Sequence, residues 1–248
     1  MPSYLITGTS RGLGLAFTTE LLNDKNNIVI ATARDIAGAG KLNALQKEHQ
    51  GRLHLVQMDV TNVDSITNAA KEVAKILPNG LDHLISSAGI STDPLSTFDN
   101  LDLKLAFEEV QFMVTGTIQV LTGFLPLISK SNIKKVLVLS SIFASVELAA
   151  GLPLAIGYSM ARAALNIAVR KWSGVLKKDN ITIALIHPGY VGSTDMGSAI
   201  LDFVTANVPD MENLTPQKSA SDVVSVLHQL KPEDNGAFFN HDGTKLPF

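Results

Sequence analysis

The chain of 248 residues contains no cysteine, so disulfides, zinc–thiolate sites and thiol catalysis are excluded together. Charge is sparse and nearly balanced, with 20 Lys and Arg against 23 Asp and Glu and no basic block. Binding nucleic acid by neutralising phosphates requires a basic surface, so the composition argues against that function. No spacing of His, Asp and Glu resembles a metal site, and none is expected.

Segments that direct a protein into a membrane are also missing. Residues 1–7 have neither the basic flank nor the apolar core of a secretory signal. The most apolar window, Val136 to Ile156, contains Ser140, Glu147 and Pro153, which a bilayer-spanning helix disfavours. The sequence therefore predicts a compact, soluble, cytoplasmic protein that does not bind a membrane.

Short apolar runs alternate with longer helical patterns along the chain. The runs that predict strands are 4–7, 28–32, 53–58, 81–86, 136–140, 182–186 and, as a seventh, 237–239. The helical patterns are 13–22, 41–50, 63–77, 103–125, 159–176 and 219–230. Continuous apolar runs are typical of parallel strands covered on both faces. The sequence predicts one α/β domain, residues 1–248, with a Rossmann-type, doubly wound parallel sheet of about seven strands and helices on both faces.

One stretch, Gly192 to Thr215, fits neither pattern. It mixes apolar residues, among them Ile200, Phe203 and Met211, with polar ones. Because it follows the sixth predicted strand, we expect an irregular, mobile flap with an apolar underside, at about residues 192–215.

The first predicted strand meets its helix through a glycine-rich turn. Its sequence contains Gly8, Ser10, Arg11, Gly12, Leu13 and Gly14, with the glycines spaced G-x-x-x-G-x-G. Glycines permit a tight turn and bring the backbone close to a pyrophosphate, whose charge then lies at a helix N-terminus. This turn predicts a dinucleotide site.

The end of the second strand indicates which dinucleotide is bound. An NAD-binding protein usually has a carboxylate there for the ribose 2′-hydroxyl, but this chain has Ala33 followed by Arg34. Arg34 can bind a 2′-phosphate through two parallel hydrogen bonds, and Arg11 adds a second cation. Asp35 follows the arginine and can point to solvent. These residues favour NADP(H), although Arg34 can also be read as a solvated surface arginine.

Six motifs occur in order at the ends of predicted strands or on the helix that follows. They are Thr7–Gly14, Asp59-Val60, Ser86–Gly89, Ser140-Ser141, Tyr158–Arg162 and His187–Gly189. With this set, the whole chain resembles the short-chain dehydrogenase/reductase family. Within the family, the overall pattern of the sequence is similar to fungal ketoreductases of the norsolorinic acid type and to sniffer-like carbonyl reductases. Residues 242–248 support a place in this part of the family.

The resemblance implies a catalytic role for Tyr158, which would give its proton to a substrate carbonyl. An unperturbed tyrosine has a pKa near ~10, so it needs a neighbouring cation to act near neutrality. The family has a lysine four residues on, whereas this chain has Arg162. An arginine keeps the charge and can hold the ribose hydroxyls, but it does not relay protons at ordinary pH.

The resemblance also implies a serine that hydrogen-bonds to the carbonyl. Ser141 stands at a predicted strand end, but it precedes Tyr158 by more than the family's usual spacing of about thirteen residues, which Ser145 has. We assign the role to Ser141 and keep Ser145 as the alternative. Alignment on Gly116 places Met113 where the family has an asparagine, and we expect Met113 to be a core residue.

Further cofactor contacts are implied position by position. Asp59 and Val60 match the pair at the adenine, and Ser87, Ala88 and Gly89 stand where the family has Asn-Ala-Gly. Pro188, Gly189 and Val191 match the segment beside the nicotinamide carboxamide, with Thr194 or Ser193 near the family's threonine. Tyr158 and Arg162 complete the cofactor set. We assign His187 a structural role, not an acid–base role, and Glu108-Glu109 to a solvated helix face.

The resemblance implies an NADPH-dependent reductase that converts a hydrophobic ketone or aldehyde to an alcohol, as in secondary metabolism. The departures at Arg162 and Met113 leave an alternative: an NADP(H)-binding protein of this fold that isomerises, cyclises or only binds. The implied partner is a small carbonyl compound. Relatives often pair through two long helices, here 103–125 and 159–176, so a homodimer or homotetramer is a further expectation.

Overall fold

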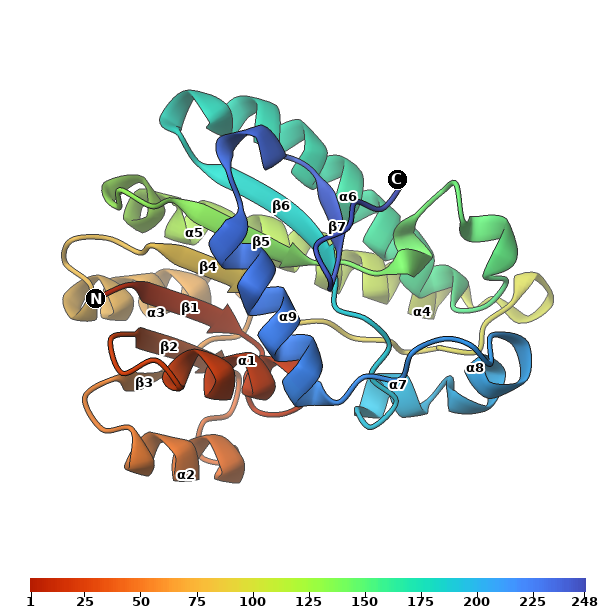
Figure 1. Ribbon diagram of the computed structural model, residues 1–248, viewed down its shortest axis with the longest axis horizontal. Helices are drawn as coiled ribbons and strands as arrows, with labels where there is room; N and C mark the ends of the chain where they lie inside the picture. The colour runs from red at the N-terminus through yellow and green to blue at the C-terminus, as the bar shows by residue number, and fades with distance from the viewer.

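The computed structural model describes residues 1–248, and its centre is one sheet of seven parallel strands (Figure 1). In spatial order the strands are β3 (Leu53–Gln57), β2 (Ile28–Ala33), β1 (Ser3–Thr7), β4 (His83–Ser86), β5 (Lys135–Leu139), β6 (Thr182–His187) and β7 (Phe238–Asn240). The chain order reverses between β1 and β4, which is where open α/β sheets place their ligands. The predicted fold class is confirmed.

Helices cover both faces of the sheet. One face carries α1 (Gly12–Leu22), α2 (Gly40–Glu48) and α9 (Pro216–Gln229), and the other carries α3 (Val63–Ile76), α5 (Gly116–Lys130) and α6 (Ile156–Leu176). Successive strand residues point to opposite faces, so Leu137 packs under α1 and α9 while Val138 packs under α5 and α6. This two-sided burial explains why the strands read as unbroken apolar runs.

The long helix expected at 103–125 is divided. It consists of α4 (Leu103–Val110), one π-helical turn (Gln111–Thr115) and α5, which continues to Lys130 in spite of Pro126. By length and composition the run from Leu103 to Lys130 could cross a membrane, but core helices of globular proteins meet the same criterion. Here α5 packs on α3, and α4 packs on α6.

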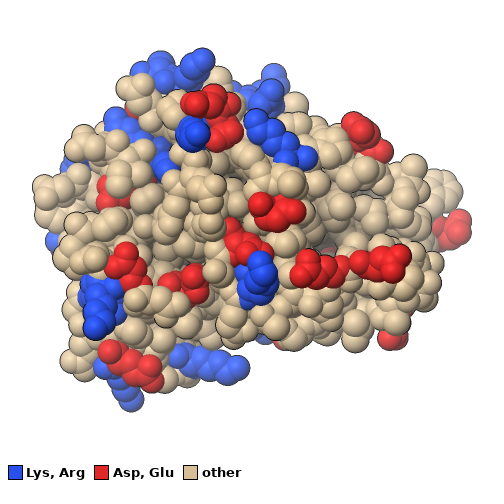
Figure 2. Space-filling model, viewed as in Figure 1, with Lys and Arg blue, Asp and Glu red and all other residues tan.

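The segment expected to be an irregular flap contains two short helices, α7 (Asp195–Ser198) and α8 (Leu201–Asn207). Thr194 caps α7 by accepting a hydrogen bond from the Gly197 amide at 3.1 Å, which makes this stretch helical. Both helices lie beyond the arrowheads of the strands (Figure 1). The face drawn in Figure 2 mixes basic and acidic side chains without a continuous basic surface, and its right-hand end carries acidic groups.

At the opposite edge, the amino ends of the central strands hold a buried aromatic stack. The rings of Tyr4 and His83 lie 4.4 Å apart and nearly parallel, and the Tyr4 hydroxyl is 3.0 Å from Nε2 of His228. Nδ1 of His83 is enclosed without a partner. Burial is the main reason that the pKa of His83 falls to about 4.

We predict from this stack that acid destabilises the protein before its carboxylates titrate. In the unfolded chain His83 takes up a proton near pH 6.5, but in the folded protein it does so only near pH 4. The free energy of unfolding is therefore highest above pH 6.5 and falls as the pH drops below it. At pH 4.5 the loss of unfolding free energy due to His83 is about 2–3 kcal/mol. Urea unfolding at pH 7.5 and 4.5 measures the loss, and His83→Phe, which keeps the stack, should reduce it. An equal loss in both proteins would contradict the assignment.

Candidate functional site

The glycine-rich turn between β1 and α1 is shaped by close backbone contacts. Gly8 and Gly12 have positive φ angles of 73° and 56°, which glycine adopts without strain. A Cβ on Gly14 would lie 2.2 Å from the Gly8 carbonyl oxygen. Only a glycine therefore lets α1 begin directly against the turn. The Arg11 side chain makes no capping hydrogen bond, so the amides at the start of α1 are available to an anion.

The loop after β4 is fixed to the same turn. Thr7 Oγ1 accepts hydrogen bonds from the amides of Ser87 at 3.0 Å and Ala88 at 2.9 Å. A Cβ on Gly8 would lie 2.9 Å from Cα of Ala88, so the two loops touch. One threonine at the end of β1 thus aligns both loops on either side of the point where the strand order reverses.

A groove of about 670 Å³ runs along these loops, and we call it the dinucleotide groove. Fifteen of the predicted cofactor residues line it: Gly8, Ser10, Arg11, Gly12, Leu13, Gly14, Arg34, Val60, Ser87, Ala88, Gly89, Tyr158, Arg162, Pro188 and Thr194. Its volume falls in the range of about 300–1,000 Å³ typical of ligand sites. Glycine backbone at one end and cations along the wall are the features that a dinucleotide requires, so the residues present fit that group.

Asp59, Gly189 and Val191 do not line this groove. The Asp59 carboxylate accepts hydrogen bonds from the Thr61 amide at 2.9 Å and hydroxyl at 2.7 Å, closing a local turn. Burial would raise the pKa of Asp59, but these bonds and the nearby Arg34 outweigh it and lower the pKa. Gly189 and Val191 line the neighbouring cavity described below.

Two cations from neighbouring elements line the groove, Arg34 after β2 and Lys41 at the start of α2. Lys41 was not among the sequence predictions, because its approach depends on how residues 35–39 turn. Asp35 takes part in that turn by accepting a hydrogen bond from the Gly38 amide at 3.0 Å. The second predicted cation, Arg11, is exposed and forms an ion pair with Asp195 of α7 at 2.9 Å, which links the turn to the flap.

A smaller cavity of about 120 Å³ joins the groove, and we call it the apolar cavity. The two share wall residues, namely Leu13, Ser140, Tyr158, Pro188, Thr194 and Met196. Further walls come from α8 and its surroundings, which contribute Ile200, Phe203, Val204, Val208 and Met211. The predicted apolar underside of the flap is therefore the roof of this cavity.

Ser141 and Tyr158 both line the apolar cavity, whereas Ser145 does not. Ser141 is the second residue after β5, and its Oγ accepts a 3.3 Å hydrogen bond from the Phe143 amide. Ser145 is 1% exposed and its Oγ accepts from the Leu148 amide instead. The residues between them form a short 3-10 turn, so the longer spacing to Tyr158 is taken up in the loop.

Arg162 lies one helical turn after Tyr158 and is 4% exposed. Its Nη1 donates a 2.7 Å hydrogen bond to the Leu139 carbonyl at the end of β5, and its guanidinium carbon is 5.1 Å from the centre of the Tyr158 ring. A Cβ on Gly89 would lie 2.6 Å from Nη2. The guanidinium is thus packed between two strand ends, with Nε enclosed and without a partner.

Met113 is 1% exposed and belongs to the π-helical turn, where it packs with Leu154, Ala155, Tyr158 and Ala161. It is a core residue packed against α6, as expected. The expectation that Glu109, one turn earlier, is solvated was wrong. It is not solvated but 1% exposed, and it accepts hydrogen bonds from the amide and hydroxyl of Thr92. The loop after β4 lies over α4 and helps to bury the Glu109 carboxylate. The helical periodicity of the sequence does not predict this contact.

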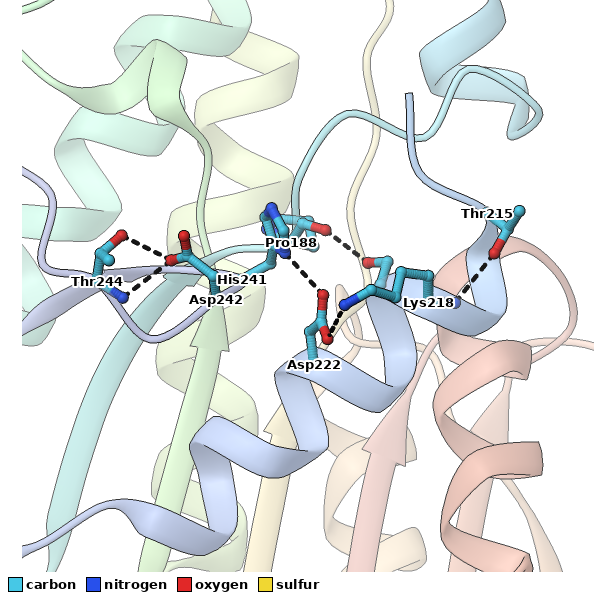
Figure 3. Close-up of polar contacts among 8 residues, drawn as sticks. Pro188, Thr215, Lys218, Asp222, His241, Asp242 and Thr244 are labelled. Atoms are coloured by element: carbon cyan, nitrogen blue, oxygen red, sulfur yellow. Dashed lines mark hydrogen bonds and ion pairs between the residues drawn. The ribbon is translucent and has the colours of Figure 1, made fainter. Parts of the chain in front are cut away.

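Helix α9 carries the side chains that hold the segments after β6 and β7 (Figure 3). Asp222 forms ion pairs with Lys218 at 2.5 Å and with Nδ1 of His241 at 2.9 Å. Ser219 donates a 2.6 Å hydrogen bond to the Pro188 carbonyl. Burial acts to raise the pKa of Asp222, but Lys218 and His241 overcome it and lower the pKa. This network fixes the Pro188 turn at the junction of groove and cavity.

Fold and site together define a dinucleotide-binding protein of the Rossmann type, and sequence comparison is more specific. Residues 3–204 match the family described as short chain dehydrogenase. An uncharacterized oxidoreductase of Schizosaccharomyces pombe is 34% identical, over 99% of this chain and 97% of that protein. The short chain dehydrogenase virK of Hypocrea virens is 31% identical over 99% of both. The chain belongs to the short-chain dehydrogenase/reductase family.

Solved structures give the same result. The NADPH-bound carbonyl reductase from chicken fatty liver has a TM-score of 0.89 and 31% identity, covering 100% of this chain and 99% of that one. The carbonyl reductase Sniffer of D. melanogaster also has a TM-score of 0.89, with 26% identity and full coverage of both chains. The predicted family is confirmed. Membership supports an oxidoreductase that uses a nicotinamide cofactor.

We predict that Gly14→Ala weakens dinucleotide binding at least tenfold. The added methyl group would meet the Gly8 carbonyl at 2.2 Å, so the turn must open and lose its fit to a pyrophosphate. Titration of NADPH followed by its fluorescence measures the change. Gly174→Ala in α6 is the matched control, because nothing lies within 4 Å of its added Cβ. Equal affinity in the two variants would show that the turn does not bind the cofactor.

Proposed function

We propose that the protein is an NADPH-dependent reductase of a hydrophobic ketone or aldehyde. One observation carries the proposal: Tyr158 and Ser141 line one apolar cavity, and that cavity shares a wall with the dinucleotide groove. A carbonyl compound in the cavity would therefore be next to both hydroxyls and to a cofactor in the groove. The carbonyl reductases of similar structure support the same reaction class.

In this reaction a carbonyl group gains a hydride at carbon and a proton at oxygen. Bound reduced nicotinamide would supply the hydride. The Tyr158 hydroxyl donates the proton, and the Ser141 hydroxyl hydrogen-bonds to the same oxygen while negative charge develops on it. Arg162 beside the phenol ring stabilises the charge that remains on Tyr158, because a guanidinium near an aromatic ring stays cationic at every working pH.

The preference for NADP(H) follows from the charges of the groove. Arg34 and Lys41 line it, and no carboxylate does so at the end of β2, where an NAD-binding protein would have one. The NADPH-bound relative from chicken liver supports this choice. The substrate is expected to be hydrophobic because the roof of the cavity is formed by the apolar residues of 192–215.

Arg162 is also the reason to keep a second candidate function. A buried guanidinium bonded to the Leu139 carbonyl cannot pass protons to Tyr158 as a lysine could. A protein with this site could bind NADP(H) and isomerise or cyclise a substrate without net hydride transfer. Consumption of NADPH, measured with and without a carbonyl substrate, separates the two functions.

The main test is the rate of NADPH oxidation with a panel of hydrophobic ketones and aldehydes. Tyr158→Phe should lower kcat by about 10²- to 10⁴-fold, because it removes the proton donor. Ser141→Ala should lower kcat about 10²-fold, and Ser145→Ala should not. Tyr4→Phe, at the far edge of the sheet, is the control. No oxidation by the unaltered protein, together with none by Arg162→Lys, would disprove the proposal.

Arg34→Ala tests the cofactor assignment separately. The loss of a charge-assisted pair with the 2′-phosphate costs about 1.5–3 kcal/mol, so the Kd for NADPH should rise about tenfold to hundredfold. The Kd for NADH should not change, since NADH has no 2′-phosphate. Calorimetric titration gives both constants. A variant that loses affinity for both cofactors equally would show that Arg34 holds another part of the dinucleotide.

A further inference from the structure

The apolar cavity contains one imidazole that the proposed reaction does not use. His187 is the last residue of β6 and lines the cavity together with Ser141 and Tyr158. The neighbouring strand is held alongside, because the Ser140 amide donates a 2.7 Å hydrogen bond to the Ile186 carbonyl. His187 therefore lies on a rigid element, at the same strand edge as the reacting groups.

The two ring nitrogens of His187 have different surroundings. Nδ1 is completely enclosed and has no hydrogen-bond partner. Nε2 has no partner either, but it is not among the enclosed atoms and keeps some accessible surface. Because His187 lines the apolar cavity, we infer that Nε2 faces it. The sequence predicted a structural role for His187, but in the structure neither ring nitrogen forms a hydrogen bond with the protein.

Most other polar side chains on the cavity wall already have partners. The Tyr190 hydroxyl donates to the Gly197 carbonyl at 3.1 Å, and Thr194 Oγ1 donates to the Val191 carbonyl at 2.8 Å. Ser140 Oγ donates to Asn166. A ligand in the cavity thus meets few polar groups without a partner. His187 Nε2 is one of them, in addition to the hydroxyls of Ser141 and Tyr158.

The charge and tautomer of His187 follow from its environment. Burial, and then the nearby His241, lower its pKa to about 4, so the ring is neutral near pH 7. His241 is itself paired with Asp222 (Figure 3). An enclosed N–H without an acceptor is rarer than an enclosed acceptor without a donor. The proton therefore belongs on Nε2, which makes the atom that faces the cavity a hydrogen-bond donor.

We propose that His187 determines specificity by donating a hydrogen bond from Nε2 to a second oxygen of the substrate, separate from the carbonyl that is reduced. The inference rests on the proposed function and narrows its substrate class. The preferred substrate is a hydrophobic ketone or aldehyde with a further carbonyl or ester oxygen. Burying such an oxygen in an apolar cavity without a hydrogen-bond donor costs binding free energy. A single donor can therefore decide which substrate is preferred.

The test compares ethyl acetoacetate with 2-heptanone, which has the same chain length but no ester oxygens. The unaltered protein should show the lower KM for the ketoester. His187→Leu should raise that KM about tenfold, leave kcat within about twofold and leave 2-heptanone unchanged. His187→Gln, which keeps an amide donor at a similar reach, should retain the preference. If the leucine variant does not fold, His187→Phe replaces it.

Binding distinguishes a failure of this inference from a failure of the proposed reaction. In NADPH-loaded Tyr158→Phe, where turnover is suppressed, calorimetry should show tighter binding of the ketoester and loss of that difference when His187→Leu is added. This result would support the role of His187 even if no NADPH were oxidised. An equal response of both ligands to the histidine substitutions, or no preference in the unaltered protein, would overturn the inference.

Discussion

The buried guanidinium of Arg162 is the interaction on which the proposed chemistry depends. It joins α6 to β5 through the Leu139 carbonyl, lies against the Tyr158 ring and touches the backbone of Gly89 after β4. A charge that is enclosed in this way needs all of these contacts, because removing one would leave it without compensation. The same contacts fix the position of the phenol. The Tyr158 ring, the wall of the groove and the strand ends are therefore held together by one side chain.

The rest of the site depends on the convergence of strand ends at one edge of the sheet. Thr7 aligns the loops after β1 and β4, Ser141 follows β5, and His187 ends β6. Helix α9 holds the segment after β6 through Ser219 and the segment after β7 through Asp222. These supports come from elements far apart in the sequence, but parallel strands bring their carboxyl ends together. The flap supplies the apolar roof residues and, with Thr194, one polar group that its own backbone holds.

Much of this could be predicted from the sequence, for physical reasons that differ by residue. The strands were recognisable because two-sided burial demands continuous apolar runs, and Gly8, Gly12 and Gly14 because their backbone conformation or packing excludes side chains. Side chains whose surroundings depend on loop paths were not predictable. Lys41 reaches the groove only because residues 35–39 turn as they do, and Glu109 is buried because α4 packs on α6 and Thr92 lies over it. The π-helical turn at Met113 and the helical flap likewise depend on tertiary packing and a local cap.

The different places of Ser141 and Ser145 show how position at a strand end and sequence spacing can lead to different residues. Spacing counts residues of a loop, and a loop can absorb extra residues without moving its ends. The end of β5 is fixed on both sides, by β4 and by β6, so the residue that follows it has little freedom. Ser141, the second residue after β5, lines the cavity, while the 3-10 turn carries Ser145 into the interior, where it accepts a hydrogen bond from the Leu148 amide. His187 is placed in the same way: it ends β6, which pairs with β5 and β7, and it lines the cavity with Nδ1 enclosed by its surroundings.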